Sequence, residues 1–216
     1  MKRLTHVAAG LALLSGALFA TSASAQVSYN VGYTSEYYFR GILQKTSSGS
    51  AGIDYESSGF YIGSWAADVG DGLEVDGYFG YGIETEQGFS ASIGFTGYYY
   101  TGEFDDTYEE INLNLGYGMF GLEYSTGEYD NFGGPKLDYD FIAATVTFEN
   151  GFYGTWGSFG DQFDGDYLEL GWGTTISDID FGIAGIFNDD MLSDQLDSNG
   201  MPDNGQAVVF SISKSW

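Results

Sequence analysis

Carboxylates are the only side chains in this sequence with both the number and the regular spacing to do chemistry. The 216 residues include 31 Asp and Glu, six Lys and Arg, one His and no Cys. The single histidine, His6, lies in an apolar leader. A Ser-His-Asp triad, a thiol nucleophile and a histidine-ligated zinc or haem are therefore excluded from the mature chain. Hydrolysis by a carboxylate pair remains open, but an enzyme ranks last among the functions considered below.

Eight of these carboxylates lie on the polar faces of segments in which apolar and polar residues alternate. Such alternation gives a strand one apolar and one polar face. Rings of Asp or Glu set cation preference in channels, and a merely solvated acidic face is the simpler alternative. The candidates for lining a passage are Glu36, Glu74, Asp76, Glu84, Glu110, Glu123, Glu169 and Asp180.

Arg40 shares the parity of Glu36 in the first alternating segment, which places it among the acids. One interpretation is a lone positive charge at a constriction. The favoured one is structural, because a half-buried arginine needs one or more carboxylate partners.

Two acidic loops offer oxygen ligands of the kind that calcium prefers. Within the second, DSNG resembles part of an EF-hand loop but lacks the remaining ligands. Loose divalent binding, or bridging to lipopolysaccharide phosphates, is an equal alternative, so we expect no specific metal and no cofactor. The weak calcium candidates are Asp161, Asp164 and Asp166 in GDQFDGD, and Asp194, Asp197 and Asp203 in NDDMLSDQLDSNGMPDNG.

Residues 1–25 are expected to be a secretory signal peptide. Lys2 and Arg3 precede an apolar run too short to span a membrane, and Ala23-Ser24-Ala25 is a small-residue cleavage site. An uncleaved anchor is the alternative. Cleavage leaves four basic and 31 acidic residues in a single domain, 26–216, with a net charge of −27. Such a chain repels nucleic acid.

About twelve alternating segments predict an all-β domain. Aromatics make up 18% and hydrophobics 43% of the chain, which argues against disorder. A change of parity at 141–142 predicts a β-bulge there. The expected strands are 27–40, 50–57, 59–69, 73–85, 88–101, 107–116, 118–126, 137–149, 151–159, 165–175, 179–187 and 206–216.

Longer and shorter connections tend to alternate along the chain, beginning with GILQKTSSGS as a long loop. Both prolines fall in the two longest connections, where no ladder hydrogen bond is lost. This pattern favours an antiparallel transmembrane β-barrel with short periplasmic turns and longer extracellular loops.

A soluble sandwich would also alternate, but it would bury its apolar face. Three features favour a membrane barrel: strand-end aromatics typical of interfacial girdles, glycines within strands, and the form of the last strand. The aromatic runs are 37–39, 98–100 and 152–153. We therefore expect five apolar residues to face lipid: Val75, Phe79, Ile93, Phe95 and Leu113.

The last strand, AVVFSISKSW, must pair with the first if the barrel is closed. Lys214 shares its apolar parity and can snorkel near a membrane boundary. A terminal aromatic on such a strand resembles the signal that outer-membrane barrels present to the barrel-assembly machinery. The residues expected to carry it are Val208, Phe210, Ile212 and Trp216.

The segment VSYNVGYTSEYYFRGILQ, followed by GIDYESSGFYIGSWAADV, resembles the amino-terminal signature of the TorF family of porins. These are proteobacterial outer-membrane proteins, also described as a conserved family of unknown function. The chain departs from the pattern at Leu43-Gln44, where Ser-Gln is usual. The resemblance implies an outer-membrane barrel with a role in transport. It is carried by Thr34, Ser35, Tyr37, Phe39, Arg40 and Gly41.

These observations favour an outer-membrane pore for passive diffusion of small hydrophilic solutes, with a preference for cations. Twelve strands lie between eight-stranded barrels, which side chains fill, and sixteen-stranded ones, which hold a channel. A closed structural or surface-binding barrel with acidic loops is therefore the alternative, and a soluble exported β protein is the third.

Overall fold

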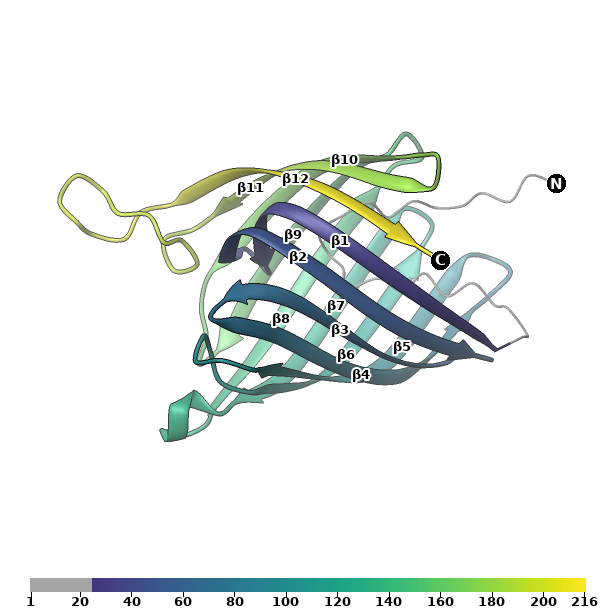
Figure 1. Ribbon diagram of the computed structural model, residues 1–216, viewed down its shortest axis with the longest axis horizontal. Coiled ribbons are helices and arrows are strands. Elements are labelled where there is room, and N and C mark those ends of the chain that lie inside the picture. Colours follow the sequence, from purple (N-terminus) through teal and green to yellow (C-terminus); the bar gives the residue numbers. More distant parts are fainter. Residues whose placement is uncertain (1–24) are drawn as a thin grey trace.

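Alternation along each strand produces a closed antiparallel barrel of twelve strands, as predicted (Figure 1). The computed structural model describes residues 25–216, so nearly all of the expected signal peptide lies outside the described residues. The strands are β1 (Gln26–Phe39), β2 (Ile42–Ser57), β3 (Phe60–Gly70), β4 (Gly72–Glu84), β5 (Phe89–Tyr100), β6 (Tyr108–Tyr117), β7 (Phe120–Tyr129), β8 (Leu137–Thr147), β9 (Phe152–Asp161), β10 (Asp166–Ile176), β11 (Ile179–Asn188) and β12 (Gly205–Ser215).

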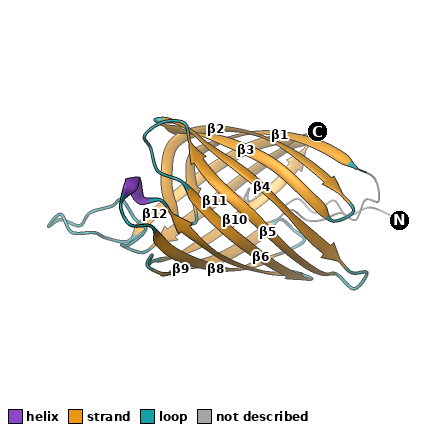
Figure 2. Cartoon of the chain, turned by 90° about the horizontal axis from the view of Figure 1, so that it is seen from below, coloured by secondary structure: helices purple, strands orange, loops and turns teal. Residues whose placement is uncertain are grey.

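Each strand pairs with its neighbours in sequence, and β1 pairs with β12 to close the ring. Gln26 and Trp216 lie at the same end of the barrel, which we call the terminal end. The opposite, loop end carries the longer connections (Figure 2). The longest is 189–204, and 130–136 contains the single turn of 3-10 helix η1 (Asn131–Gly133). Within residues 25–216, no helix is long and apolar enough to cross a membrane.

The apolar side chains point away from the barrel axis, as expected. Phe79, Ile93 and Leu113 are 50%, 56% and 43% exposed on the outer wall. On the inner wall, Glu74 and Asp76 are buried. A sandwich with these apolar residues at a dry centre is thereby excluded.

The first connection is not the predicted long loop. The strands β1 and β2 form one long hairpin closed by a two-residue turn at Arg40 and Gly41. Both have positive φ, 47° and 82°, which a type I′ turn requires. A Cβ added to Gly41 would fall 2.7 Å from the ring of Tyr167, so glycine is needed here for space as well. The sequence did not predict a strand over residues 44–50 because they include no large apolar side chain, so no apolar–polar alternation is visible there.

The tip of this hairpin leaves the barrel wall. Only five residue pairs join β1 to β12, ending at Thr34 and Ser211, and the β2–β3 ladder starts at Ser50 and Ala67. Residues 35–49 therefore lie outside the wall ladders, and we call them the inner hairpin. Their end bends into the barrel at the loop end (Figure 1, purple strands at the left). A register shift after Tyr37 marks the departure.

The predicted β-bulge at 141–142 is wrong. The register of β8 with β7 and with β9 continues through Phe141 and Ile142 without a shift. Parity changes in the sequence because Tyr139 and Phe141, although aromatic, face inward and are buried there. Ile142 faces outward and is exposed.

The aromatic runs predicted to form outer girdles are mostly inside the barrel, so that expectation is also wrong for them. Tyr37 and Tyr98 are buried, and Tyr100 and Tyr153 donate hydrogen bonds to inner-wall carboxylates. The outer wall does carry aromatics near the terminal end, among them Tyr81, Tyr117, Phe120 and Trp172.

Candidate functional site

The site is centred on Arg40, at the tip of the inner hairpin, which reaches across the lumen to the far wall. Its Nη1 and Nη2 donate to Oε2 and Oε1 of Glu110 on β6, both at 2.8 Å. Nη2 also donates to Oε1 of Glu123 at 2.8 Å and to Oγ of Ser125 at 3.1 Å, both on β7. The ring of Phe141 on β8 lies 4.2 Å from the guanidinium carbon. We call Glu110, Glu123, Ser125 and Phe141 the Arg40 cage.

Glu110 is held in place by three further donors on the wall. The hydroxyls of Tyr98 and Tyr139 donate to it at 2.7 and 2.9 Å, and Nδ2 of Asn112 donates at 2.7 Å. With Arg40, these groups saturate both carboxylate oxygens. The carboxylate is thus oriented by the wall and not by the hairpin alone.

The Arg40–Glu110 pair is almost completely out of water, with side chains 8% and 0% exposed. Removing two charges from water is costly, and it is offset here by two-point geometry and a full set of hydrogen bonds. Phe39, on the hairpin, lies 4.9 Å from the same guanidinium. Flat aromatic faces beside a planar cation add cation–π attraction.

A second group of inner acids lies on β4, beside the hairpin. Glu74 accepts hydrogen bonds from the hydroxyls of Tyr37 at 2.5 Å and Tyr100 at 3.0 Å. Asp76 is completely buried, and neither carboxylate oxygen has a hydrogen-bond partner. Trp65, directly opposite Asp76 on β3, has an unpartnered Nε1 donor. This part of the lumen has polar capacity that its own side chains do not use.

The remaining candidates for lining a passage are spread along the lumen. Glu169 accepts from the hydroxyl of Tyr153 at 2.5 Å. Glu84 and Asp180 lie at the terminal end, where Thr175 donates to Asp180 at 2.5 Å. Glu36 lies on the inner hairpin, away from Arg40's partners. The structure therefore brings Arg40, Glu110 and Glu123 together, places Glu74 and Asp76 side by side on β4, and leaves Glu36, Glu84, Glu169 and Asp180 apart from both groups.

The calcium candidates do not converge. No group of three or more acidic side chains in residues 25–216 is arranged to hold a metal ion. Asp197 instead accepts the backbone N–H groups of Asn199 and Met201 at 2.7 and 2.9 Å. Asp164 and Asp203 accept the N–H group of the next residue in the same way. These carboxylates shape their own loops, as Asp commonly does in turns.

The inner hairpin is anchored at further points around the lumen. Nδ2 of Asn188, at the end of β11, donates to the carbonyl of Gly41 at 2.7 Å. Leu192, in the 189–204 loop, packs with Phe141 and Tyr167 in a buried cluster against which Ile42 lies. Lys45 pairs with Asp68 on the adjacent strand β3. The hairpin is thus fixed by both near and far walls.

Sequence reasoning missed the aromatic half of this site. Tyr98 and Tyr139 orient Glu110, and Phe141 lies against the guanidinium of Arg40. All three are aromatic residues, which are also common on a lipid-facing wall. The usable signal was parity: in the predicted strand 137–149, Tyr139 and Phe141 fall out of phase with Ile142, Val146 and Phe148.

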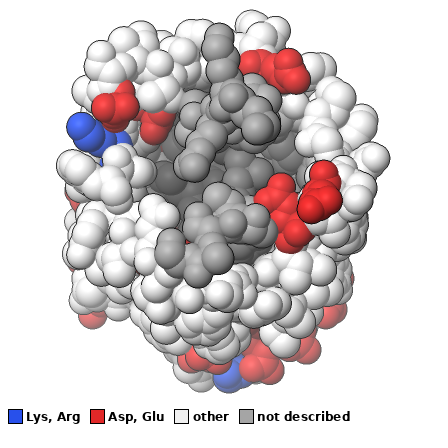
Figure 3. Space-filling view, turned by 90° about the vertical axis from the view of Figure 1, so that its right-hand side faces the viewer, with Lys and Arg blue, Asp and Glu red and all other residues white. Residues whose placement is uncertain are grey.

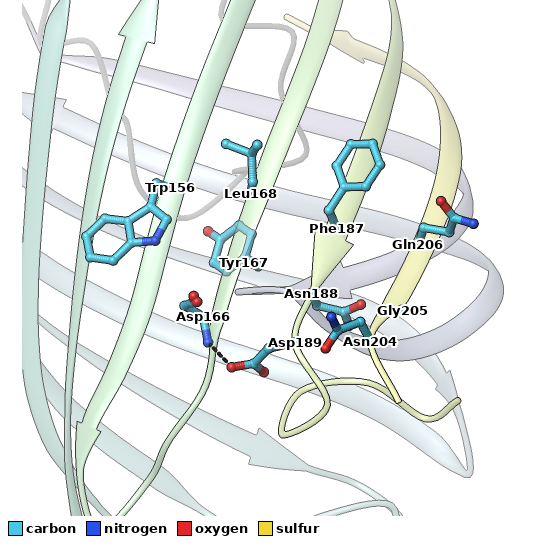
Figure 4. Close-up of a pocket in the computed structure, with 10 residues that line it drawn as sticks. All are labelled: Trp156, Asp166, Tyr167, Leu168, Phe187, Asn188, Asp189, Asn204, Gly205 and Gln206. Carbon is cyan, nitrogen blue, oxygen red and sulfur yellow. Dashed lines mark hydrogen bonds between the residues drawn. The ribbon is translucent and has the colours of Figure 1, made fainter. Parts of the chain in front are cut away.

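A shallow hollow of about 520 Å³ lies beneath the 189–204 loop, at the loop end of β9 to β12 (Figure 4). Outward-facing Trp156, Leu168 and Phe187, paired across neighbouring strands, form its apolar side. Its polar rim is internally bonded, with the N–H of Asp166 donating to Asp189 at 2.9 Å. It is open to the outside and separate from the Arg40 cage.

Comparison with solved structures gives partial matches of low sequence identity. The outer membrane protein OpdK of Pseudomonas aeruginosa matches with 12% identity and a TM-score of 0.41, over 80% of this chain and 58% of that one. OccAB2 of Acinetobacter baumannii matches with 13% identity and a TM-score of 0.43, over 89% and 64%. The chain thus spans less than two thirds of either protein.

No curated protein matches the sequence. A family model described as a bacterial protein of unknown function (Gcw_chp) matches residues 19–185, well over half of the chain. The TorF resemblance noted above agrees with this match in pointing to a bacterial family of unknown function. The chain belongs to the Gcw_chp family.

Proposed function

We propose that this protein is an outer-membrane channel for passive diffusion of small hydrophilic solutes, with a preference for cations. The observation that carries the proposal is the direction of the side chains: apolar residues cover the outer wall, and carboxylates line the inner one. That arrangement suits a cylinder with hydrocarbon outside and water inside.

The charge of the lumen supports the preference for cations. Inner-wall carboxylates lie on β4, β6, β7 and β10, whereas Arg40 is the basic residue that reaches the far wall. Seen from the terminal end, the rim of the barrel also carries more acidic than basic side chains (Figure 3). A passage lined by one sign of charge concentrates counter-ions and repels co-ions. Diffusion needs no cofactor and no catalytic group.

The outer wall supports the location. It would contact lipid, with lipopolysaccharide at the loop end, in an outer membrane. Val208, Phe210, Ile212 and Trp216 are all exposed on it, where the barrel-assembly machinery could engage β12. These partners are part of the proposal.

A closed structural barrel is the second candidate, and one observation favours it. The inner hairpin and its aromatic partners occupy the loop-end half of the lumen, with Tyr37, Trp65, Tyr98 and Phe141 all buried. The channel proposal therefore requires the hairpin to move, whereas the closed barrel requires it to stay.

Single-channel recording in planar bilayers separates the two candidates. We expect conductance with a cation-selective reversal potential in a KCl gradient, rare in the wild type and frequent in Arg40→Ala, which loses the far anchor of the hairpin. Lys45→Ala is the comparison variant: it removes the hairpin's ion pair with the adjacent strand β3 but leaves the anchor on the far wall, so its conductance should stay as rare as in the wild type. Absence of conductance in all three proteins would favour the closed barrel, and an anion-selective current would contradict the role of the carboxylates.

A further inference from the structure

The Arg40 cage has the properties of a binding site that is occupied by a residue of its own chain. Every one of its four residues belongs to the far wall, on β6, β7 and β8, and none belongs to the hairpin. Glu110 is oriented by Tyr98, Asn112 and Tyr139, which are also wall residues. The cage therefore keeps its geometry when the hairpin withdraws.

The chemistry of the cage selects a planar, forked cation. Glu110 engages two different nitrogens of the guanidinium at equal distances of 2.8 Å, which a single ammonium nitrogen cannot reproduce. Glu123 and Ser125 engage one of those nitrogens from a second direction. Phe141 covers the face of the group. These are the features by which proteins distinguish guanidinium from ammonium.

The neighbouring wall carries polar groups that the protein itself does not satisfy. Asp76 is buried with both oxygens unpartnered, and it lies directly opposite Tyr98, whose hydroxyl binds Glu110. Trp65, on the other side of Asp76, offers an unpartnered N–H. Buried polar groups are normally bonded, and each exception calls for a partner. A solute bound beside Trp65, Asp76 and Tyr98 would bring hydrogen-bond donors to the carboxylate of Asp76.

We infer that the Arg40 cage is a recognition site for solutes bearing a guanidinium group, and that Arg40 is its resident competitor. Binding of such a solute displaces Arg40, removes the far anchor of the inner hairpin and frees the loop-end half of the lumen. Asp76 accepts hydrogen bonds from the rest of the solute. This inference rests on the proposed channel for its physiological meaning, but the binding itself does not require conductance.

Calorimetric titration of the purified, folded barrel with butylguanidinium tests the site directly. We expect Arg40→Ala to bind butylguanidinium at least tenfold more tightly than the wild type, because the competitor is gone. Arg40→Ala/Glu110→Gln should lose that binding. Butylammonium, with the same chain and charge, should bind Arg40→Ala at least tenfold more weakly than butylguanidinium does.

Arg40→Lys provides a second test if the alanine variant does not fold. Lysine keeps the charge but cannot make the two-point contact, so butylguanidinium should displace it more readily than it displaces Arg40. Equal affinity for butylguanidinium in the wild type and in a folded Arg40 variant would overturn the inference, as would equal binding of butylammonium. A conducting Arg40→Ala barrel that does not bind butylguanidinium would leave the channel intact and end the inference. Binding of butylguanidinium without conductance would support the recognition site and count against the channel.

Discussion

The ion pair between Arg40 and Glu110 yields the most direct energetic prediction. We consider Arg40→Met, Glu110→Gln and the double variant, because methionine keeps a long side chain beside Phe141 and glutamine keeps the shape of the carboxylate. Both partners are at least nine-tenths buried in side-chain terms. Removing one of them therefore strands a charge that water cannot reach.

Breaking a buried pair in this way typically costs about 3–5 kcal/mol. Arg40→Met should fall at the lower end, about 3 kcal/mol, because Tyr98, Asn112 and Tyr139 still donate to Glu110. Glu110→Gln should cost about 2 kcal/mol, since Arg40 keeps Glu123. The double variant strands no charge at Glu110 and should also cost about 3 kcal/mol, which leaves a coupling energy of about 2 kcal/mol.

Urea unfolding of the barrel in detergent micelles, followed by tryptophan fluorescence, measures these free energies. Urea is preferable to guanidinium chloride, because guanidinium would compete for the cage. Lys136 and Asp130 form a matched control pair, with Nζ to Oδ1 at 2.9 Å but both side chains about half exposed, and should show little or no coupling. If the changes in unfolding free energy for Arg40→Met and Glu110→Gln add up to that of the double variant within about 0.5 kcal/mol, the energetic role assigned to the pair is refuted.

Three other outcomes follow from the same structure. Ile93→Arg, on the outer wall, should destabilise the barrel in lipid vesicles by about 2–4 kcal/mol, whereas Asn114→Arg, facing the lumen, should have a much smaller effect on urea unfolding. Phe141→Ala should cost about 3–5 kcal/mol in the same assay and should increase conductance, because Phe141 packs against the hairpin from inside; an unchanged unfolding midpoint would contradict that placement. The pKa of Asp197 lies below its ordinary value because backbone N–H groups bind its carboxylate. The 189–204 loop should therefore lose amide-exchange protection as the pH falls through that lowered pKa and keep it above the usual aspartate range. Protection that is unchanged by acid or by Asp197→Ala would disprove this role.

The wall of the barrel could be predicted from alternation alone. Strands such as β4 and β6 expose apolar residues on one face and carry mostly small or polar ones on the other, so period two predicts both the strand and its facing. Most of the other strand boundaries are also plain, because turns rich in glycine or acidic residues separate the strands. The pattern within each single strand is sufficient to predict that part of the fold.

The inner hairpin could not be predicted from alternation in the same way. Residues 44–50 are mostly small or polar, typical of a loop, and they form a strand because they pair with β1 in a long hairpin. Phe141 faces inward because the register of β8 places it on the inner wall, where Phe159, Tyr167 and the inner hairpin bury it. Such facing depends on contacts between residues far apart in the sequence, and alternation does not report them.

The inward tip also imposes an order on how the molecule is made. Its contacts join residues 70, 83 and 147 positions apart, and the surface it docks against consists of strands that must first assemble side by side. Contacts of such long sequence separation are slow to form. The inner hairpin is therefore expected to dock only after the strands of the far wall have paired, so the lumen would be open before the hairpin fills it. We expect the docking of the inner hairpin to be the last step in the folding of this protein.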